Sequence, residues 1–83
     1  MDEKLELERL AVKYSLYLQF RDARAIKWVH EHSSGIAAGM RFSENMIEKF
    51  ITEGNFDAAK KAFEELVRQD NLAAKLCRDG EGD

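Results

Sequence analysis

The sequence predicts a small all-α domain, and three observations lead to that class. The 83-residue chain contains no proline and only five glycines, which favours long helices over a turn-rich β fold. Hydrophobic residues make up 45% and charged residues 35% of the chain, as in globular proteins. Apolar residues also recur at helical spacing. We expect a single domain over residues 1–77, in which one long N-terminal helix packs on an antiparallel helical hairpin. This arrangement has three helices, with a short fourth helix as a variant.

The first helix is expected to run from Asp2 to about His32. This stretch lacks glycine and proline and is rich in good helix formers such as leucine, glutamate and alanine. Asp2 is a suitable N-cap residue. The pair Ser33-Ser34 followed by Gly35 is a typical helix stop.

Residues 34–43 admit two interpretations. They form either a loop or short helix ahead of a helix capped by Ser43, or the first turns of one helix from about Gly35 to Glu53. We favour the single helix slightly, because four apolar residues keep helical spacing along it. These residues are Ile36, Met40, Ile47 and Ile51.

A turn at Gly54-Asn55 is the clearest break in the chain. Glycine suits the left-handed residue just after a helix, and asparagine can cap the helix that follows. That helix has an apolar stripe formed by Phe56, Ala59, Phe63, Leu66 and Val67. We expect helix to continue through Cys77, and residues 78–83 to form a disordered acidic tail.

Part of this hairpin follows a pattern known from repeat proteins. A glycine at the turn is followed by an aromatic residue, a small residue and a second aromatic residue, here Gly54, Phe56, Ala59 and Phe63. Asp70 falls at the acidic end of the pattern. Residues 40–71 thus resemble a single tetratricopeptide repeat unit, which implies a helix-turn-helix hairpin. The residues that depart from the family pattern are Ser43, Ile47, Leu66 and Asn71. A peptide-binding superhelix is not implied, because it needs at least three stacked repeats.

The first helix carries two apolar stripes when residues are placed at 100° intervals. One stripe contains Leu7, Leu10, Ala11, Tyr14, Leu18, Ala25, Trp28 and Val29. The other lies on roughly the opposite side and contains Leu5, Val12, Leu16, Phe20 and Ala23. A surface helix needs only one apolar stripe, and the hairpin is too short to cover both. We interpret the second stripe as an interface with another protein molecule. The alternative is that the last helix wraps over it.

Candidate chemistry is sparse. His30 and His32 lie two residues apart, so on a helix they point in different directions and do not form a metal-binding pair. Cys77 is the single cysteine, and no Cys-x-x-Cys motif is present. Ser33 and Ser34 lack the surroundings of a catalytic nucleophile. We therefore expect no enzymatic activity, no catalytic residue, no metal and no cofactor.

A basic cluster offers a second candidate site. Arg21, Arg24, Lys27 and Arg41 are candidate contacts for an anionic partner, such as an acidic protein surface, a phosphate ligand or nucleic acid. In the alternative that we favour, Arg21 and Lys27 pair with acidic residues of the second half. The acidic residues available for such pairing are Glu44, Glu48 and Glu53.

The net charge of −3 argues against bulk nucleic-acid binding. No apolar run is long enough to span a membrane, and no signal peptide is visible, so we expect a cytoplasmic protein. The leading hypothesis is a non-enzymatic protein–protein interaction module. It would be a small homodimeric adaptor or inhibitor of bacterial or phage type, with a second copy or a larger protein as partner. The alternative is a helical dimer that binds nucleic acid or a phosphate ligand through the basic cluster.

Overall fold

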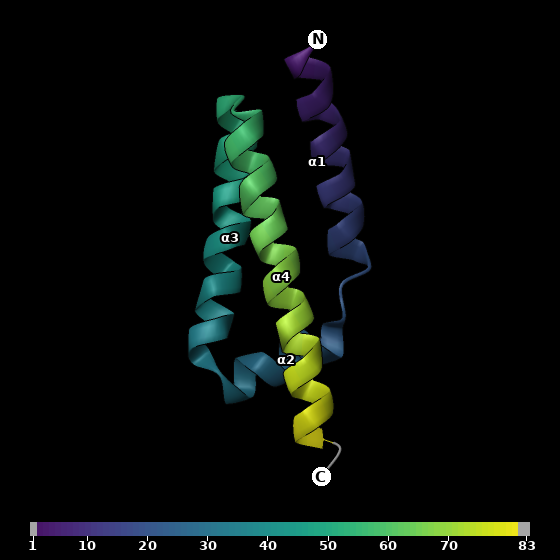
Figure 1. Ribbon diagram of the computed structural model, residues 1–83, viewed down its shortest axis with the longest axis vertical. Coiled ribbons are helices and arrows are strands. Elements are labelled where there is room, and N and C mark those ends of the chain that lie inside the picture. The colour runs from purple at the N-terminus through teal and green to yellow at the C-terminus, as the bar shows by residue number, and fades with distance from the viewer. Residues whose placement is uncertain (1, 82–83) are drawn as a thin grey trace.

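The computed structural model describes residues 2–81, and every regular element in that range is a helix (Figure 1). The helices are α1 (Glu3–Gln19), α2 (Ala23–His32), α3 (Ser34–Glu53) and α4 (Phe56–Glu81). The all-α class is therefore confirmed, but the described chain has four main helices and not three.

The predicted continuous helix from Asp2 to His32 is wrong, because the chain leaves the helical path between α1 and α2. The backbone N–H of Phe20 donates to the carbonyl of Tyr17 and closes α1 with a tight turn. The Asp22 carboxylate accepts a hydrogen bond from the Ala25 N–H at 3.1 Å and starts a new helix. A capping aspartate thus stands at a position that the surrounding helix formers made to look like helix interior.

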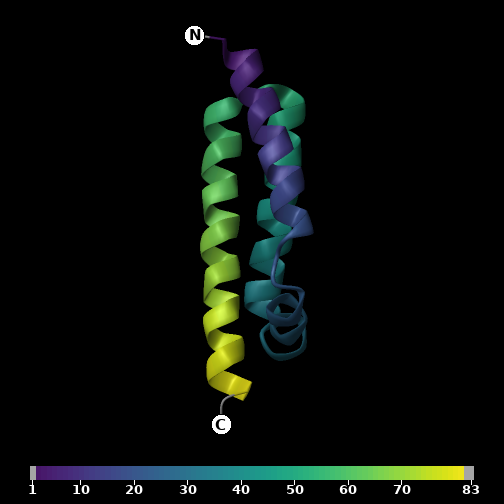
Figure 2. The same cartoon turned by 90° about the vertical axis from the view of Figure 1, so that its right-hand side faces the viewer.

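The hairpin of α3 and α4 is formed as expected (Figures 1 and 2). Gly54 is left-handed with φ +76°, and the N–H groups of Gly54 and Asn55 donate to carbonyls of the last turn of α3. The Asn55 side chain accepts from the Ala58 N–H at 3.2 Å and caps α4. Residues 34–43 are helical throughout, so the single-helix interpretation is correct. The hairpin implied by the tetratricopeptide resemblance is also present.

The longest helix, α4, packs against α1, α2 and α3, while α2 crosses at one end of the molecule (Figures 1 and 2). The largest fully buried side chains are Met40 and Ile47 from α3, Leu66 from α4 and Val29 from α2. Ala25 is buried with Val29, so α2 contributes to the core two residues of the predicted stripe that runs from Leu7 to Val29. The core therefore centres on α4, and α1 adds to it from one side through the buried Leu10 and Tyr14 and the partly buried Tyr17.

Residues 78–81 are helical and not the disordered tail that was predicted, because α4 continues through them. Ala73 and Cys77 are buried, so the helix keeps an inward-facing side beyond Asn71. Gly80 then lies against Trp28, where an added Cβ would be 2.6 Å from Cζ2 of the indole. Packing on α2 thus supports the last turns of α4, while residues 82–83 of the predicted tail lie outside the described residues.

Gly80→Ala is expected to displace the Trp28 indole, because the new methyl group would overlap it. Trp28 is the only tryptophan, so its fluorescence emission should shift to longer wavelength as the ring becomes more exposed. Gly35→Ala is the matched control, since nothing lies within 4 Å of its Cβ position. The control should leave the emission unchanged and raise the free energy of unfolding by up to about 1 kcal/mol. An unchanged spectrum for Gly80→Ala would contradict the packing of α4 on α2.

Candidate functional site

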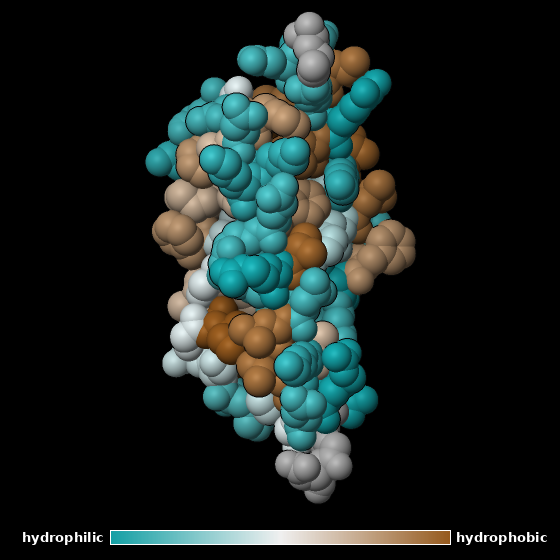
Figure 3. All heavy atoms as spheres, viewed as in Figure 1, coloured by the Kyte–Doolittle hydropathy of each residue, from teal (hydrophilic) through white to brown (hydrophobic). Residues whose placement is uncertain are grey.

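The outward side of α1 exposes a row of large apolar side chains. Phe20 is 81% exposed, Val12 60%, Leu16 51% and Leu5 42%. We call these four residues the α1 apolar face. Hydrophobic surface is visible along the edge of the molecule where α1 lies (Figure 3). No helix within residues 2–81 wraps over this face, so the alternative in which the last helix covers it is wrong.

Ala23, the fifth residue of the predicted interface, is exposed but stands apart from the other four. It begins α2, on the far side of the break at Phe20–Asp22. A stripe drawn on one continuous helix therefore cannot be extended to it. Phe20 itself is the C-cap of α1 and not a residue within a longer helix.

An open groove of about 870 Å³ between α1 and α4 adjoins the α1 apolar face. Leu16 and Phe20 belong to both features. The other apolar lining residues are Leu10, Tyr17, Phe56, Phe63 and Val67. The charged lining residues are Glu6, Arg9, Lys13, Lys60 and Glu64. The Lys13 ammonium lies 5.9 Å from the centre of the Phe63 ring, in range for a cation–π contact. The face and groove together form one apolar surface with a charged border.

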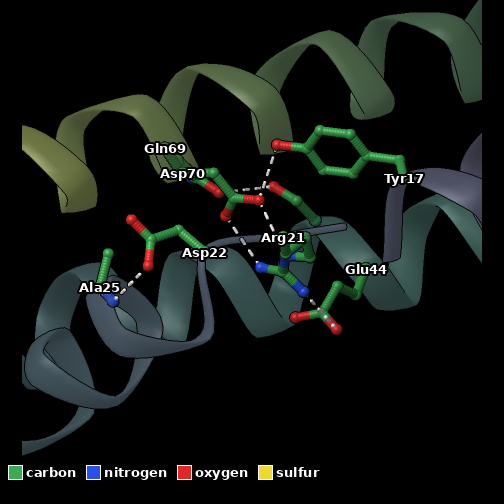
Figure 4. A network of polar contacts seen from close by, with 8 residues as sticks. Tyr17, Arg21, Asp22, Ala25, Glu44, Gln69 and Asp70 are labelled. Carbon is green, nitrogen blue, oxygen red and sulfur yellow. Dashed lines mark hydrogen bonds and ion pairs between the residues drawn. The ribbon is translucent and has the colours of Figure 1, made fainter. Parts of the chain in front are cut away.

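A polar network fixes the end of α1 on the hairpin (Figure 4). Asp70 of α4 accepts hydrogen bonds from the Tyr17 hydroxyl at 2.7 Å and from Nε and Nη2 of Arg21, both at 2.8 Å. Nη1 of Arg21 lies 3.3 Å from Glu44 of α3. The side chains of Arg21 and Asp70 are each only 10% exposed. This pairing joins the segment after α1 to both helices of the hairpin.

The network and its surroundings change the ionisation of several groups. Burial is the main cause that raises the pKa of Tyr17, and the hydrogen bond to Asp70 and the charge of Asp70 raise it further. Burial alone would lower the pKa of Arg21, but Asp70 and Glu44 outweigh it and raise that pKa. Burial and the charges of Glu48 and Glu44 raise the pKa of Tyr14 to about 12.

Arg21, one of the four residues of the basic cluster, takes part in this network. The favoured pairing of Arg21 with acidic residues of the second half is confirmed, with Glu44 as one partner. Asp70, the stronger partner, was not anticipated in this role. Lys27 and Arg24 are exposed on α2, and Arg41 is exposed on α3. Arg21 is therefore already engaged within the molecule and is not available to a phosphate group without breaking the network.

The histidines lie in the last turn of α2, where a positive charge would be favoured by the helix dipole. The His32 ring stacks on Trp28 at 4.4 Å, and its Nδ1 lies 2.9 Å from the Trp28 carbonyl oxygen. Cys77 is buried in the core. Within residues 2–81, no three or more histidine, cysteine or acidic side chains gather in a way that could hold a metal ion.

A second open groove, between α3 and α4, was missed by the sequence analysis. Its most prominent residue is Phe42, which is 64% exposed. Phe42, Met46 and Phe50 line it from α3 at four-residue spacing, a signal that was available in the sequence. The floor contains the small residues Ala38, Gly39, Ala58 and Ala62. Only two of its lining residues, Lys61 and Glu65, are charged, and it contains no residue of the α1 apolar face.

Comparison with known proteins identifies no relative of this chain. No family model matches the chain, and neither curated proteins nor solved structures give a match. None of the helices in residues 2–81 has the length and apolar content needed to cross a membrane.

Tyr17→Phe is expected to lower the free energy of unfolding by about 1.5–3 kcal/mol, because the hydroxyl donates to a carboxylate. Tyr14→Phe is the matched control on the same helix. Within residues 2–81 the buried Tyr14 hydroxyl has no hydrogen-bond partner, so its removal should be neutral or stabilising. Urea denaturation of both variants measures the difference. Equal losses would contradict the role of the network.

The free energy of unfolding is expected to fall between pH 10 and pH 12. The raised pKa values mean that both tyrosines keep their protons in the folded state while the unfolded state ionises near pH 10. Stability from this source is complete below pH 10 and is lost as the pH rises toward the folded pKa. Denaturation from pH 9 to pH 12 should show a shallower fall in the Tyr17→Phe and Tyr14→Phe variants, in which lysine titration is unchanged. Identical slopes in wild type and both variants would be the contrary result.

Proposed function

We propose that the protein is a non-enzymatic interaction module that binds another protein molecule through the α1 apolar face. The observation that carries the proposal is the exposure of Leu5, Val12, Leu16 and Phe20 along one side of α1, beside an open apolar groove. Apolar surface gains about 25 cal/mol for each Å² removed from water. A contiguous exposed patch of this kind is typical of interaction sites.

The construction of the surface supports the same role. The face is presented by a helix, and its position is fixed by the contacts of Tyr17 and Arg21 with Asp70. A preformed surface loses less conformational entropy on binding than a mobile one. Phe20 projects at the end of the face, and exposed aromatic residues are enriched at interfaces.

An adaptor or inhibitor is the form of this function that suits the chain best. Such proteins act by occupying a surface, which requires no chemistry beyond complementary contacts. Small regulatory proteins of bacteria and phages work in this way, and we propose that this chain belongs to that functional type. The nucleic-acid or phosphate alternative has less support, because Arg21 is held by Asp70 and Glu44.

Photo-crosslinking in living cells tests the use of this face. A benzoyl-phenylalanine at position 16 is expected to give a discrete crosslinked product, because Leu16 lies within the α1 apolar face. The same group at position 72 is the matched control, since Leu72 is similarly exposed but lies on α4 outside both grooves. Phe20→Glu should reduce the product at position 16. Equal crosslinking from positions 16 and 72 would overturn the proposed function.

A further inference from the structure

We infer that the α1 apolar face binds the same face of a second copy of the chain, with the two α1 helices antiparallel. The inference rests on the proposed function and names the partner. It is carried by the charge distribution along α1 and by the spread of apolar residues over its length.

The charges of α1 divide into two opposite halves. Residues 3–8 contain three glutamates and one lysine, so their net charge is −3 + 1 = −2; these are Glu3, Glu6, Glu8 and Lys4. Residues 9–19 contain Arg9 and Lys13 and no acidic residue, so their net charge is +2. An antiparallel pair places each acidic half beside the basic half of the other copy. A parallel pair would place like charges together.

The apolar residues match the same antiparallel arrangement. Leu5 lies in the first turn of α1, Val12 lies near its middle, and Phe20 lies at its end. Around a two-fold axis level with Leu10 and Ala11, Leu5 of one copy faces Leu16 of the other, and Glu8 faces Lys13. A two-fold interface must be complementary to itself, and this face satisfies that condition in both charge and hydrophobicity. Opposed helix dipoles also favour antiparallel packing.

The groove between α1 and α4 enlarges the contact beyond one helix face. α1 has 17 residues and is therefore about 26 Å long. Specific interfaces begin at about 1,200 Å² of total buried surface. A pair of helices of this length needs the groove border, including Phe20 and Lys13, to reach that size. We therefore expect a dimer that dissociates on dilution and not a permanent one.

Analytical ultracentrifugation of the full chain over a concentration series tests the partner. The mass should rise from 9.6 kDa toward twice that value as the concentration increases. Leu16→Glu combined with Phe20→Glu should weaken association at least tenfold. Phe42→Glu, an equally drastic change in the other groove, should leave it unchanged. A wild-type chain that stays at 9.6 kDa throughout would overturn the inference. Crosslinking of position 16 to a different protein would still support the proposed function, so the two failures can be told apart.

Charge reversal tests the orientation with variants that keep every apolar contact. Arg9→Glu combined with Lys13→Glu should weaken an antiparallel dimer at least tenfold at low salt, because two attractive contacts become repulsive. In a parallel dimer the same change replaces one repulsion between like charges by another and leaves the affinity nearly unchanged. Circular dichroism establishes that the variant remains folded. An unchanged affinity in a folded variant would overturn the antiparallel arrangement.

Disulfide formation gives a second measure of orientation. In a Cys77→Ala background, Leu5→Cys and Leu16→Cys chains should each crosslink poorly alone and at least tenfold better when mixed, because these two positions face each other in the antiparallel pair. Efficient crosslinking of Leu5→Cys chains with each other would indicate a parallel pair and contradict the inference.

Discussion

The ion pair between Arg21 and Asp70 is the constraint on which the placement of α1 depends. An arginine side chain that is only 10% exposed is stable only when its charge and its donors are matched, and Asp70 and Glu44 supply that match. The chain brings Arg21 to this position by leaving the helical path at Phe20–Asp22. The break, the docking of Tyr17 and the direction of α1 are consequences of one electrostatic requirement. Loss of either partner would leave a buried charge, which typically costs about 3–5 kcal/mol.

The contacts of Tyr17 and Arg21 with Asp70 also explain why one side of α1 faces away from the hairpin. Leu10, Tyr14 and Tyr17 face the hairpin, and the rings of both tyrosines lie within 6 Å of the Phe63 ring centre. Once these residues are docked, Val12 and Leu16 on the opposite side of the helix can only face outward. The apolar residues on that side add nothing to the core of the described chain. The proposed contact with a further molecule gives these residues a role that folding of the described chain does not.

Local signals in the sequence were sufficient for the hairpin and insufficient for the first half of the chain. Gly54 and Asn55 predict the turn because each has a specific backbone or capping role. Asp22 caps the start of α2 in the same way, but the neighbouring contact of Arg21 with a residue 49 positions away has no local signal in the sequence. The sequence likewise predicts a disordered tail at residues 78–83, since nothing local shows that Trp28 packs over Gly80. Leu5, Val12, Leu16 and Phe20 are exposed on one side of α1, whereas Ala23 lies apart from them because the helix breaks after Gln19.

The limited attachment of α1 has a consequence for how the molecule opens. The α3–α4 hairpin is sealed by Met40, Ile47 and Leu66, which are almost completely enclosed. α1 is tied down by two core side chains and one polar cluster at its end. Amide hydrogens in α1 should therefore exchange with solvent through a partial opening that leaves the hairpin intact. The α1 apolar face is thus carried by the helix that opens more easily than the hairpin. Association through this face would protect the amide hydrogens of α1 from exchange.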